Sequence, residues 1–289
     1  MDTTGDAGVA AVLGHLGVQP EAKLGHGGEA VVYAIDDERV VRVLHEGGRV
    51  DDIVRRQRLV DELARAQPPY ALPRVIETGD VDGRVYAIER RLRGRSLLDE
   101  LKSASGAQRR RLIEAYLETA AALGDLRLDP RTEFGDLVGD DPVTAPTWRA
   151  FLEAKAAANL ARSTPALRGI DPVALAAPFD EPATKSFVHL DAFAGNMLTD
   201  GTSITAVIDI GVTSVAGDRR FDVLASATYL GAPVEPSAAS ESDSRFALGW
   251  LRDRGLDGGY DEFRRWIAAY WSFALDDARL LAWCESVLT

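Results

Sequence analysis

The chain has 289 residues, 46% of them hydrophobic and 27% charged, which is enough for one large domain or for two lobes that share a cleft. Its formal net charge of −12 excludes a nucleic-acid partner, because contacts to a phosphate backbone need a basic face. The chain has one cysteine, so no disulfide within it is expected. It has no apolar run of the roughly 18 residues that span a bilayer and no basic start typical of a signal peptide. We therefore expect a cytoplasmic protein with no membrane partner.

The first 92 residues are predicted to form a small, mostly-β lobe. Two strands of a hairpin are expected within residues 23–45, where glycines alternate with β-branched residues. A helix is expected over residues 51–66, because its apolar residues have helical spacing and Pro68 ends the pattern. Two further strands, at residues 73–78 and 84–89, complete the order β-β-α-β-β.

Residues 93–289 are predicted to form a larger, mostly-α lobe. Helical spacing recurs in four segments, which are 107–125, 146–162, 245–256 and 260–288. Short β-rich pieces lie between them, at residues 187–190 and 204–210. The implied architecture is a bilobal α+β chain with a hinge near residues 89–94.

The strongest motif is the segment that begins at His189 and contains Asp191 and Asn196; Asp209 follows Asn196 after thirteen residues, within Val-Ile-Asp-Ile-Gly. Phosphoryl transfer needs a carboxylate beside the attacking hydroxyl and oxygen ligands for Mg²⁺. The spacing H-x-D-x-x-x-x-N followed by D-x-G resembles the catalytic loop and metal-binding aspartate of the kinase superfamily. Its surroundings resemble the aminoglycoside phosphotransferase family. The alternative interpretation is an aspartate turn between two strands, with Asn196 capping a bend.

The resemblance implies a protein-kinase-like fold, with residues 1–92 as the nucleotide-binding lobe and 93–289 as the catalytic and substrate-binding lobe. It makes Asp191 the catalytic base or hydroxyl-orienting residue and His189 a brace for the loop. Asn196 and Asp209 become the Mg²⁺ ligands. The sequence departs from the usual motif at Leu190, where most relatives have glycine, but no proposed ligand is lost.

A second match to the family lies downstream, in the segment Gly-Asp-Arg-Arg-Phe-Asp-Val-Leu-Ala that starts at Gly217. An aspartate that opens a helix can accept hydrogen bonds from backbone N–H groups. We therefore expect Asp222 to support the catalytic loop, as it does in the family. Asp218 is open between such a scaffold role and the edge of the substrate site.

The glycine-rich segment near the start fits the kinase pattern G-x-G-x-x-G-x-V, with Gly25, Gly27 and the adjacent Gly28, and with Ala30 at the third glycine position. Such a hairpin turn can close over phosphates and donate backbone N–H groups to them. Glycine-rich hairpins are common, so this motif supports a nucleotide site only together with the catalytic loop.

The phosphate-anchoring lysine of kinases has no counterpart on the following strand, where Arg42 stands instead. A guanidinium can hold phosphates bidentately. The helical wheel of residues 51–66 favours Gln57 or Asp61 as its inward partner and turns Glu62 away. The alternative is that Arg42 is a surface residue at the rim of the strand.

The expected hinge offers backbone groups rather than side chains. Residues 86–94 resemble the hydrophobic-Met-Glu-x-x-x-Gly segment of the family. By this resemblance, the backbone groups of Glu89 and Arg91 would meet the edge of the adenine ring.

The acceptor is expected to be cationic, because an acidic chain attracts cations, although the charge could equally serve solubility alone. Carboxylates and aromatic residues of the last helices are candidates for its site: Asp261, Glu262, Asp276, Asp277 and Glu285, with Trp266, Tyr270, Trp271 and Trp283. The alternative is that the aromatic residues are core and the carboxylates are solvated.

Together these features predict an O-phosphotransferase that uses ATP or GTP with Mg²⁺ and acts on a hydroxyl of a small, cationic molecule. Within the resembled family, the first choice is an antibiotic-inactivating enzyme for an aminoglycoside or a cationic peptide antibiotic, which would give resistance. One alternative is a metabolic kinase for an amino sugar or a choline-like alcohol. Another is a non-catalytic, nucleotide-binding pseudokinase, suggested by Arg42 and the altered loop.

Overall fold

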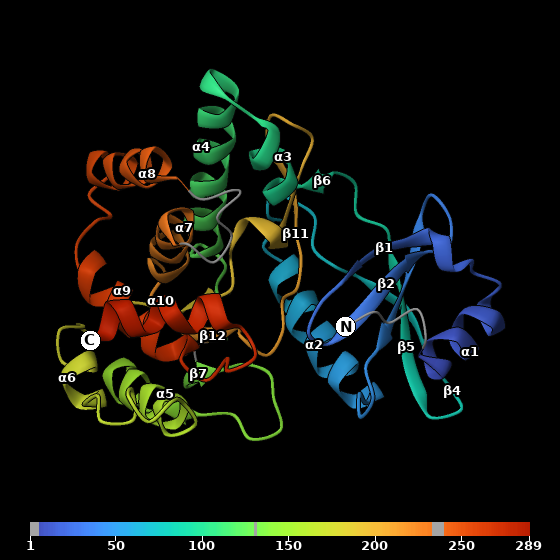
Figure 1. The fold of residues 1–289 in the computed structure, drawn as a ribbon, viewed down its shortest axis with the longest axis horizontal. Helices are drawn as coiled ribbons and strands as arrows, with labels where there is room; N and C mark the ends of the chain where they lie inside the picture. The colour runs from blue at the N-terminus through green and yellow to red at the C-terminus, as the bar shows by residue number, and fades with distance from the viewer. Residues whose placement is uncertain (1–5, 130–131, 233–239) are drawn as a thin grey trace. The chain divides into compact units, whose positions relative to one another are not determined.

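The structure is a computed structural model that describes residues 6–129, 132–232 and 240–289. The chain divides into two compact units. The first holds the described residues up to Arg93 together with Ala206–Ile210, and the second holds the described residues of Gly94–Thr205 and those from Gly211 onward. Figure 1 shows the elements of each unit in chain order.

A five-stranded antiparallel sheet forms the centre of the first unit, in the order β1-β2-β3-β5-β4. Its strands are β1 (Lys23–His26), β2 (Ala30–Ala34), β3 (Arg39–Leu44), β4 (Val75–Val81) and β5 (Arg84–Arg90). The turn between β4 and β5 consists of Asp82 and Gly83, whose φ angles of 52° and 81° suit a tight hairpin. The sequence predicted two strands within residues 23–45, where the structure has three, because the glycine-rich turn separates β1 from β2. The strands predicted at residues 73–78 and 84–89 correspond to β4 and β5 to within a few residues.

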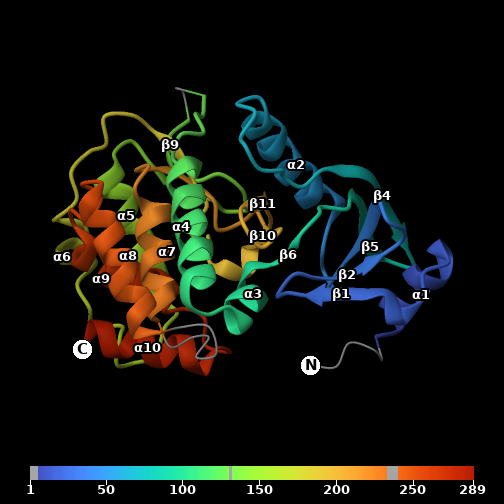
Figure 2. The ribbon, with the colours of Figure 1, turned by 90° about the horizontal axis from the view of Figure 1, so that it is seen from above.

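Helices cover both faces of this sheet. Side chains alternate along β3, so Val41 and Val43 pack toward α1 (Ala7–Leu16), whereas Leu44 packs with Ile53 of α2 (Val50–Ala64). In Figure 2, α2 lies along one side of the strands and α1 beyond the other. The alternation also places Arg42 on the α2 face, among buried residues rather than at the rim.

Helix α1 was not predicted, although its boundary signals are present in the sequence. The Asp6 side chain caps it by accepting hydrogen bonds from the N–H groups of Gly8 and Val9, and Gly17 ends it with a φ of 67°. Asp6 also forms an ion pair with Arg84 at 2.9 Å, which links the cap to β5.

The second unit is mostly helical. Its helices are α3 (Leu97–Ser103), α4 (Gly106–Leu123), α5 (Trp148–Ala161), α6 (Pro172–Ala176), α7 (Phe221–Gly231), α8 (Glu241–Asp253), α9 (Tyr260–Trp271) and α10 (Ala278–Leu288). The helical segment expected over residues 260–288 is two helices, because the Asp277 side chain caps α10 by accepting the N–H groups of Arg279 and Leu280.

Two small sheets accompany these helices. One has the order β11-β10-β6, and the other has the order β8-β7-β12-β9. Their strands are β6 (Arg95–Ser96), β7 (Phe134–Asp136), β8 (Thr144–Ala145), β9 (Ser186–Val188), β10 (Met197–Thr199), β11 (Ile204–Val207) and β12 (Val215–Gly217). The last two residues of β11 belong to the first unit.

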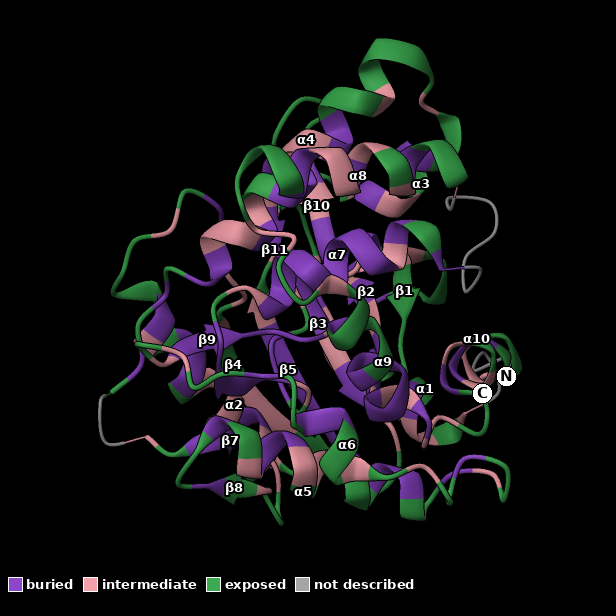
Figure 3. Ribbon diagram, turned by 90° about the vertical axis from the view of Figure 1, so that its left-hand side faces the viewer, coloured by how far each residue is buried: buried purple, intermediate pink, exposed green. Residues whose placement is uncertain are grey.

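The core of the second unit is aromatic and centred on α7, which is almost entirely buried (Figure 3). The ring of Phe221 contacts those of Trp148 and Phe263, each with a centroid distance of 4.8 Å. A mostly-β first unit and a mostly-α second unit confirm the predicted α+β fold class. Among the described residues, the helices are too short or too polar to cross a bilayer.

Candidate active site

The loop that carries His189, Asp191 and Asn196 connects β9 to β10 and is held by a buried carboxylate. Asp222, in the first turn of α7, accepts hydrogen bonds from the backbone N–H groups of His189 (2.8 Å) and Leu190 (2.9 Å). Burial raises the pKa of the Asp222 carboxyl to about 6, against the opposing effects of His189 and of these two N–H donors. These contacts confirm the predicted scaffold role of Asp222.

The carbonyl groups of the same loop are held by hydroxyl groups from the surrounding helices. The Ala192 carbonyl accepts hydrogen bonds from Tyr116 of α4 (2.7 Å) and Ser226 of α7 (2.9 Å). The Leu190 carbonyl accepts one from Tyr229 (2.7 Å), whose own oxygen accepts a bond from Trp271 (2.9 Å). With two backbone N–H groups and two carbonyl groups held in this way, the backbone of the loop is restrained.

Leu190 has a φ of 60°, in the left-handed region that favours glycine. This explains why the resembled family has glycine at this place in the motif. The Leu190 side chain is fully buried, so its packing offsets the backbone strain. Asp209 also has a φ of 60°. Strained backbone of this kind is concentrated at functional sites in many proteins.

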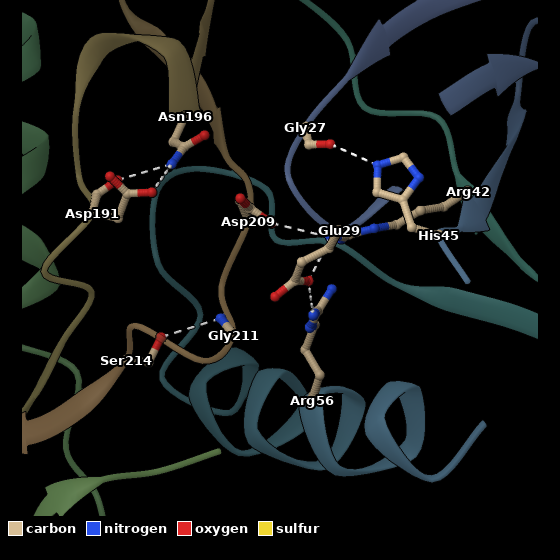
Figure 4. A network of polar contacts seen from close by, with 10 residues as sticks. All are labelled: Gly27, Glu29, Arg42, His45, Arg56, Asp191, Asn196, Asp209, Gly211 and Ser214. Atoms are coloured by element: carbon tan, nitrogen blue, oxygen red, sulfur yellow. Dashed lines mark hydrogen bonds and ion pairs between the residues drawn. The ribbon is translucent and has the colours of Figure 1, made fainter. Parts of the chain in front are cut away.

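Asp191 and Asn196 are brought together by the short helical turn Ala194–Asn196 (Figure 4). The Asn196 amide nitrogen donates to the Asp191 backbone carbonyl (2.9 Å) and to its carboxylate (3.1 Å). The donation fixes the direction of the amide, so its oxygen, for which no hydrogen bond is found within the described chain, is available as a ligand. An amide oxygen beside a carboxylate suits Mg²⁺.

His189, for which the sequence analysis predicts a bracing role, lies at the start of this loop, directly after β9. It is fully buried, and its ring meets that of Phe187 edge-on at a centroid distance of 6.3 Å. His189 thus contributes a buried ring contact and the backbone N–H that Asp222 accepts.

Arg42, Glu29, Arg56 and Asp209 form a connected group of ion pairs in the first unit (Figure 4). The Arg42 guanidinium lies 3.2 Å from the Glu29 carboxylate and 3.2 Å from that of Asp209. Arg56, on α2, pairs with the same Glu29 oxygen atom. The two guanidiniums are only 15% and 17% exposed, which makes anionic partners necessary.

Three of these side chains, those of Arg42, Arg56 and Asp209, line an open pocket between β3, β5 and α2. Its polar lining comes from Arg42, Arg56, Gln57, Glu89 and Asp209. Apolar side chains complete the wall: Leu44, Ile53, Val60, Pro73, Val75 and Ile210. Burial raises the pKa of the Glu89 carboxyl, while Arg42 and Arg56 oppose that shift. A cationic pair beside an apolar wall is suited to an anionic ligand with an apolar part.

The glycine-rich turn between β1 and β2 is held from one side. His45 lies 3.0 Å from the Gly27 carbonyl oxygen, and its backbone N–H donates to Glu29. Gly25, Gly27 and Gly28 all avoid the left-handed region, and a Cβ atom on any of them would meet open space. Neither backbone conformation nor packing within the chain requires glycine at these positions.

The structure corrects the predicted partner of Arg42. The Gln57 amide oxygen accepts the Val75 N–H (2.8 Å), and its nitrogen donates to Asp61 (2.7 Å). Gln57 therefore ties α2 to β4, and the carboxylates that hold Arg42 are Glu29 and Asp209. The helical wheel placed Gln57 on the correct face but could not show which groups lie opposite it.

The backbone groups expected at the hinge are largely occupied. Glu89 lies within β5 and pairs with Val40 on one side and Val75 on the other. The Arg91 N–H donates to the Glu38 carbonyl at 2.7 Å. The Arg91 N–H is thus unavailable to a base in this conformation, and it is the Glu89 side chain that faces the pocket.

The candidate acceptor residues separate into structural and exposed ones. Trp266, Tyr270 and Trp283 are buried in the core, and Glu285 accepts a hydrogen bond from Thr164 (3.1 Å). Asp277 caps α10, as described above. Asp261, Glu262 and Asp276 are exposed. Asp218, the residue left open by the sequence, is 4% exposed and paired with Arg220 at 2.7 Å, so it is scaffold.

Sequence reasoning missed Glu29, Arg56 and His45. Glu29 directly follows the paired glycines Gly27 and Gly28, and a charged residue there is a usable signal. No sequence signal marks Arg56, because α2 carries several arginines and only the structure shows which of them faces the pocket.

The sequence model of the phosphotransferase enzyme family, APH, matches residues 22–267. No curated protein matches the chain.

Several solved structures share the fold at low sequence identity. The ADP-bound aminoglycoside phosphotransferase APH(2'')-Ib is 16% identical, with a TM-score of 0.61 over 98% of this chain and 96% of that one. The gentamicin complex of APH(2")-IIa is 18% identical, with a TM-score of 0.62 over 98% and 95%. A putative fructosamine-3-kinase from Haemophilus somnus 129PT is 13% identical, with a TM-score of 0.58 over 92% and 90%.

Proposed function

The chain belongs to the phosphotransferase enzyme family, and on that premise we propose that it transfers the γ-phosphate of ATP or GTP to a hydroxyl group of a small, cationic molecule. Membership makes it a small-molecule kinase that acts on hydroxyl groups. The observation that carries the finer proposal is the Asp191–Asn196 pair, held in a loop whose backbone is fixed by Asp222 and by three hydroxyl groups.

In the proposed reaction, Asp191 orients the acceptor hydroxyl and takes its proton as the phosphoryl group leaves the nucleotide. His189 braces the loop. The oxygen atoms of Asn196 and Asp209 would hold Mg²⁺, which supplies charge neutralisation on the phosphates when bound. Arg42 would anchor the phosphates in the position where most kinases have lysine.

The glycine turn supports a nucleotide as the donor. Gly25, Gly27 and Gly28 are not required by backbone conformation or by packing, which leaves close approach of a ligand as the physical reason for them. Gln57 and Glu89 line the pocket beneath and would contact the nucleotide there. Backbone contacts of Glu89 and Arg91 with the base would require the Arg91 N–H to leave Glu38.

For the acceptor, we propose an aminoglycoside or a cationic peptide antibiotic, with resistance as the consequence and the cytoplasm as the place of reaction. The similarity to structures of aminoglycoside phosphotransferases, one with gentamicin bound, favours this choice. The similarity to a putative fructosamine-3-kinase favours a second candidate, a metabolic kinase for an amino sugar. Both acceptors combine hydroxyl groups with amines, which suits a chain of net charge −12.

The test is a panel of acceptors with the full chain, Mg²⁺ and either ATP or GTP. The panel holds aminoglycosides, cationic peptide antibiotics, fructosamine-type amino sugars and choline. Phosphate on one acceptor class, detected by mass spectrometry and absent with Asp191→Asn, is the expected result. Tight nucleotide binding without transfer to any acceptor would instead indicate a pseudokinase.

A further inference from the structure

Arg56 lines the pocket of the first unit, yet the proposed function gives this cation no role. It projects from α2 into the pocket that Arg42 also lines, and only 17% of its side chain is exposed. A guanidinium held this far from water is costly unless anions contact it. Its position is therefore informative about the ligand of the pocket.

One carboxylate oxygen serves both arginines. The Oε2 atom of Glu29 accepts hydrogen bonds from Arg42 (3.2 Å) and from Arg56, and Figure 4 shows the two guanidiniums approaching it from different elements. Glu29 itself sits on the glycine turn and is 38% exposed, more than twice as much as either arginine. The carboxylate thus caps the two cations from the more open side.

The Glu29 carboxylate does not satisfy all the hydrogen-bond donors of Arg56. Its Nε–H is buried and has no acceptor within the described chain. A buried donor without a partner is unfavourable by about 1–3 kcal/mol. Arginine binds phosphate through two parallel N–H groups. A phosphate can offer a separate oxygen atom to each N–H group, whereas both arginines here share the Oε2 atom of Glu29. A phosphate in place of the Glu29 carboxylate would use the Nε–H that the carboxylate leaves unpaired.

Arg56 also has fewer ion-pair partners than Arg42 among the described residues. Arg42 shares its charge between Glu29 and Asp209, one of the proposed Mg²⁺ ligands. For Arg56, the ion pair in the structure is the one with Glu29. If Glu29 moves with the glycine turn, the charge of Arg56 becomes available to a new anion.

We infer that Arg56 is a second phosphate-binding residue, that it forms a two-arginine anion site with Arg42, and that Glu29 occupies this site until nucleotide phosphates displace its carboxylate. The inference rests on the proposed function in one respect, namely that the donor is a nucleoside triphosphate. It goes further by assigning the phosphates two cations from different elements and a competing anion from the chain itself.

The test measures the binding of ATP, ADP and adenosine to the full chain by calorimetry at constant Mg²⁺, without an acceptor. Arg56→Gln should weaken ATP binding about tenfold, as expected for a lost charge-assisted contact, and leave adenosine binding unchanged. Arg58→Gln is the matched control, because Arg58 is an exposed residue of the same helix. Arg56→Lys should restore part of the ATP affinity.

Glu29→Gln is expected to change the affinity for ATP in the opposite direction. A neutral carboxamide competes less with phosphate, so ATP should bind roughly two- to fivefold more tightly. Weaker ATP binding in Glu29→Gln would show that Glu29 organises the arginines rather than competing for them, and would overturn the displacement. Equal losses for ATP and adenosine in Arg56→Gln would overturn the phosphate contact. A native chain that binds neither ATP nor GTP would refute the proposed donor itself, whereas a failure of Arg56→Gln alone leaves that donor intact.

Discussion

Leu190 combines an unfavourable backbone conformation with a favourably buried side chain, and two variants can separate these two contributions to the free energy of unfolding. Its φ of 60° is strained for any residue with a Cβ atom, whereas its side chain is fully buried. The variants Leu190→Ala and Leu190→Gly both remove the packing of the side chain. They differ in whether a Cβ remains, so the difference in their stabilities reports the backbone strain.

The glycine variant is expected to be more stable than the alanine variant, which is the opposite of the usual order. Truncating a buried leucine to alanine costs about 2–5 kcal/mol in either variant. In ordinary backbone, glycine is a further 0.5–1 kcal/mol or so less stable than alanine. A left-handed residue with a Cβ costs about 1–2 kcal/mol, which glycine avoids. Leu190→Gly should therefore be more stable than Leu190→Ala by about 0.5–1 kcal/mol.

Urea unfolding followed by tryptophan fluorescence is the assay, because all five tryptophans belong to the second unit, as does this loop. Ala192→Gly is the control, since Ala192 is buried in the same loop with φ outside the left-handed region. It should lose about 0.5–1 kcal/mol, the ordinary cost of glycine. If Leu190→Ala is as stable as Leu190→Gly or more so, the loop is not strained at this residue.

Four further predictions concern turnover, metal, phosphate and pH. Asp191→Asn should lower turnover by at least about 10²-fold while nucleotide affinity, measured by calorimetry, stays unchanged; near-native turnover would remove Asp191 from its role. Asp209→Ala should abolish the Mg²⁺-dependent part of nucleotide affinity, and a titration that finds equal Mg·ATP affinity in both proteins would contradict the assignment. Arg42→Ala should raise the nucleotide KM and lower kcat, and Arg42→Lys should recover much of both; unchanged kinetics would place the phosphate anchor elsewhere. Burial raises the pKa of Asp222 to about 6 in the native state, whereas an aspartate of the unfolded chain has a pKa of about 4. Between these two pH values the native state keeps the proton that the unfolded chain releases. The contribution of Asp222 to the free energy of unfolding therefore falls as the pH rises from about 4 to 6. The difference in unfolding free energy between the native chain and Asp222→Asn should therefore decrease over that range, and a pH-independent difference would refute the shift.

The parts of the fold that the sequence predicted well are those encoded by local patterns. β-branched residues and glycines marked the strand-forming regions of the first sheet, although β1 and β2 were not separated, and helical spacing marked α2, α4 and α5. The segment from His189 to Asn196 could be predicted as a candidate catalytic loop because the kinase motif has a fixed spacing within one loop. Helix α1 was missed because it is short, although Asp6 and Gly17 bound it clearly.

Contacts between residues far apart in sequence were beyond these patterns. The Tyr116 and Tyr229 hydroxyls that hold the loop come from helices whose sequences show only that the residues could be core. Their roles depend on helix packing, which periodicity does not specify. The same limit explains the wrong partner for Arg42, because a helical wheel gives a direction from the helix axis and no information about the opposite surface.

If Arg42 takes the place of the kinase lysine, as proposed, this replacement is matched by a change on the neighbouring helix, and the two changes make sense together. A kinase lysine is a point charge that one helical carboxylate can hold, whereas a guanidinium has donors in a planar fork that can reach two carboxylates at once. In this chain those carboxylates are Glu29, on the glycine turn, and Asp209. With the acid supplied by the turn, α2 no longer needs to provide one, and it presents the cation Arg56 to the pocket instead. The charged residue that α2 presents to the pocket is therefore a cation, where the kinase pattern has a carboxylate, while the turn keeps the two arginines paired. Binding of the nucleotide should then depend on how readily Glu29 leaves them.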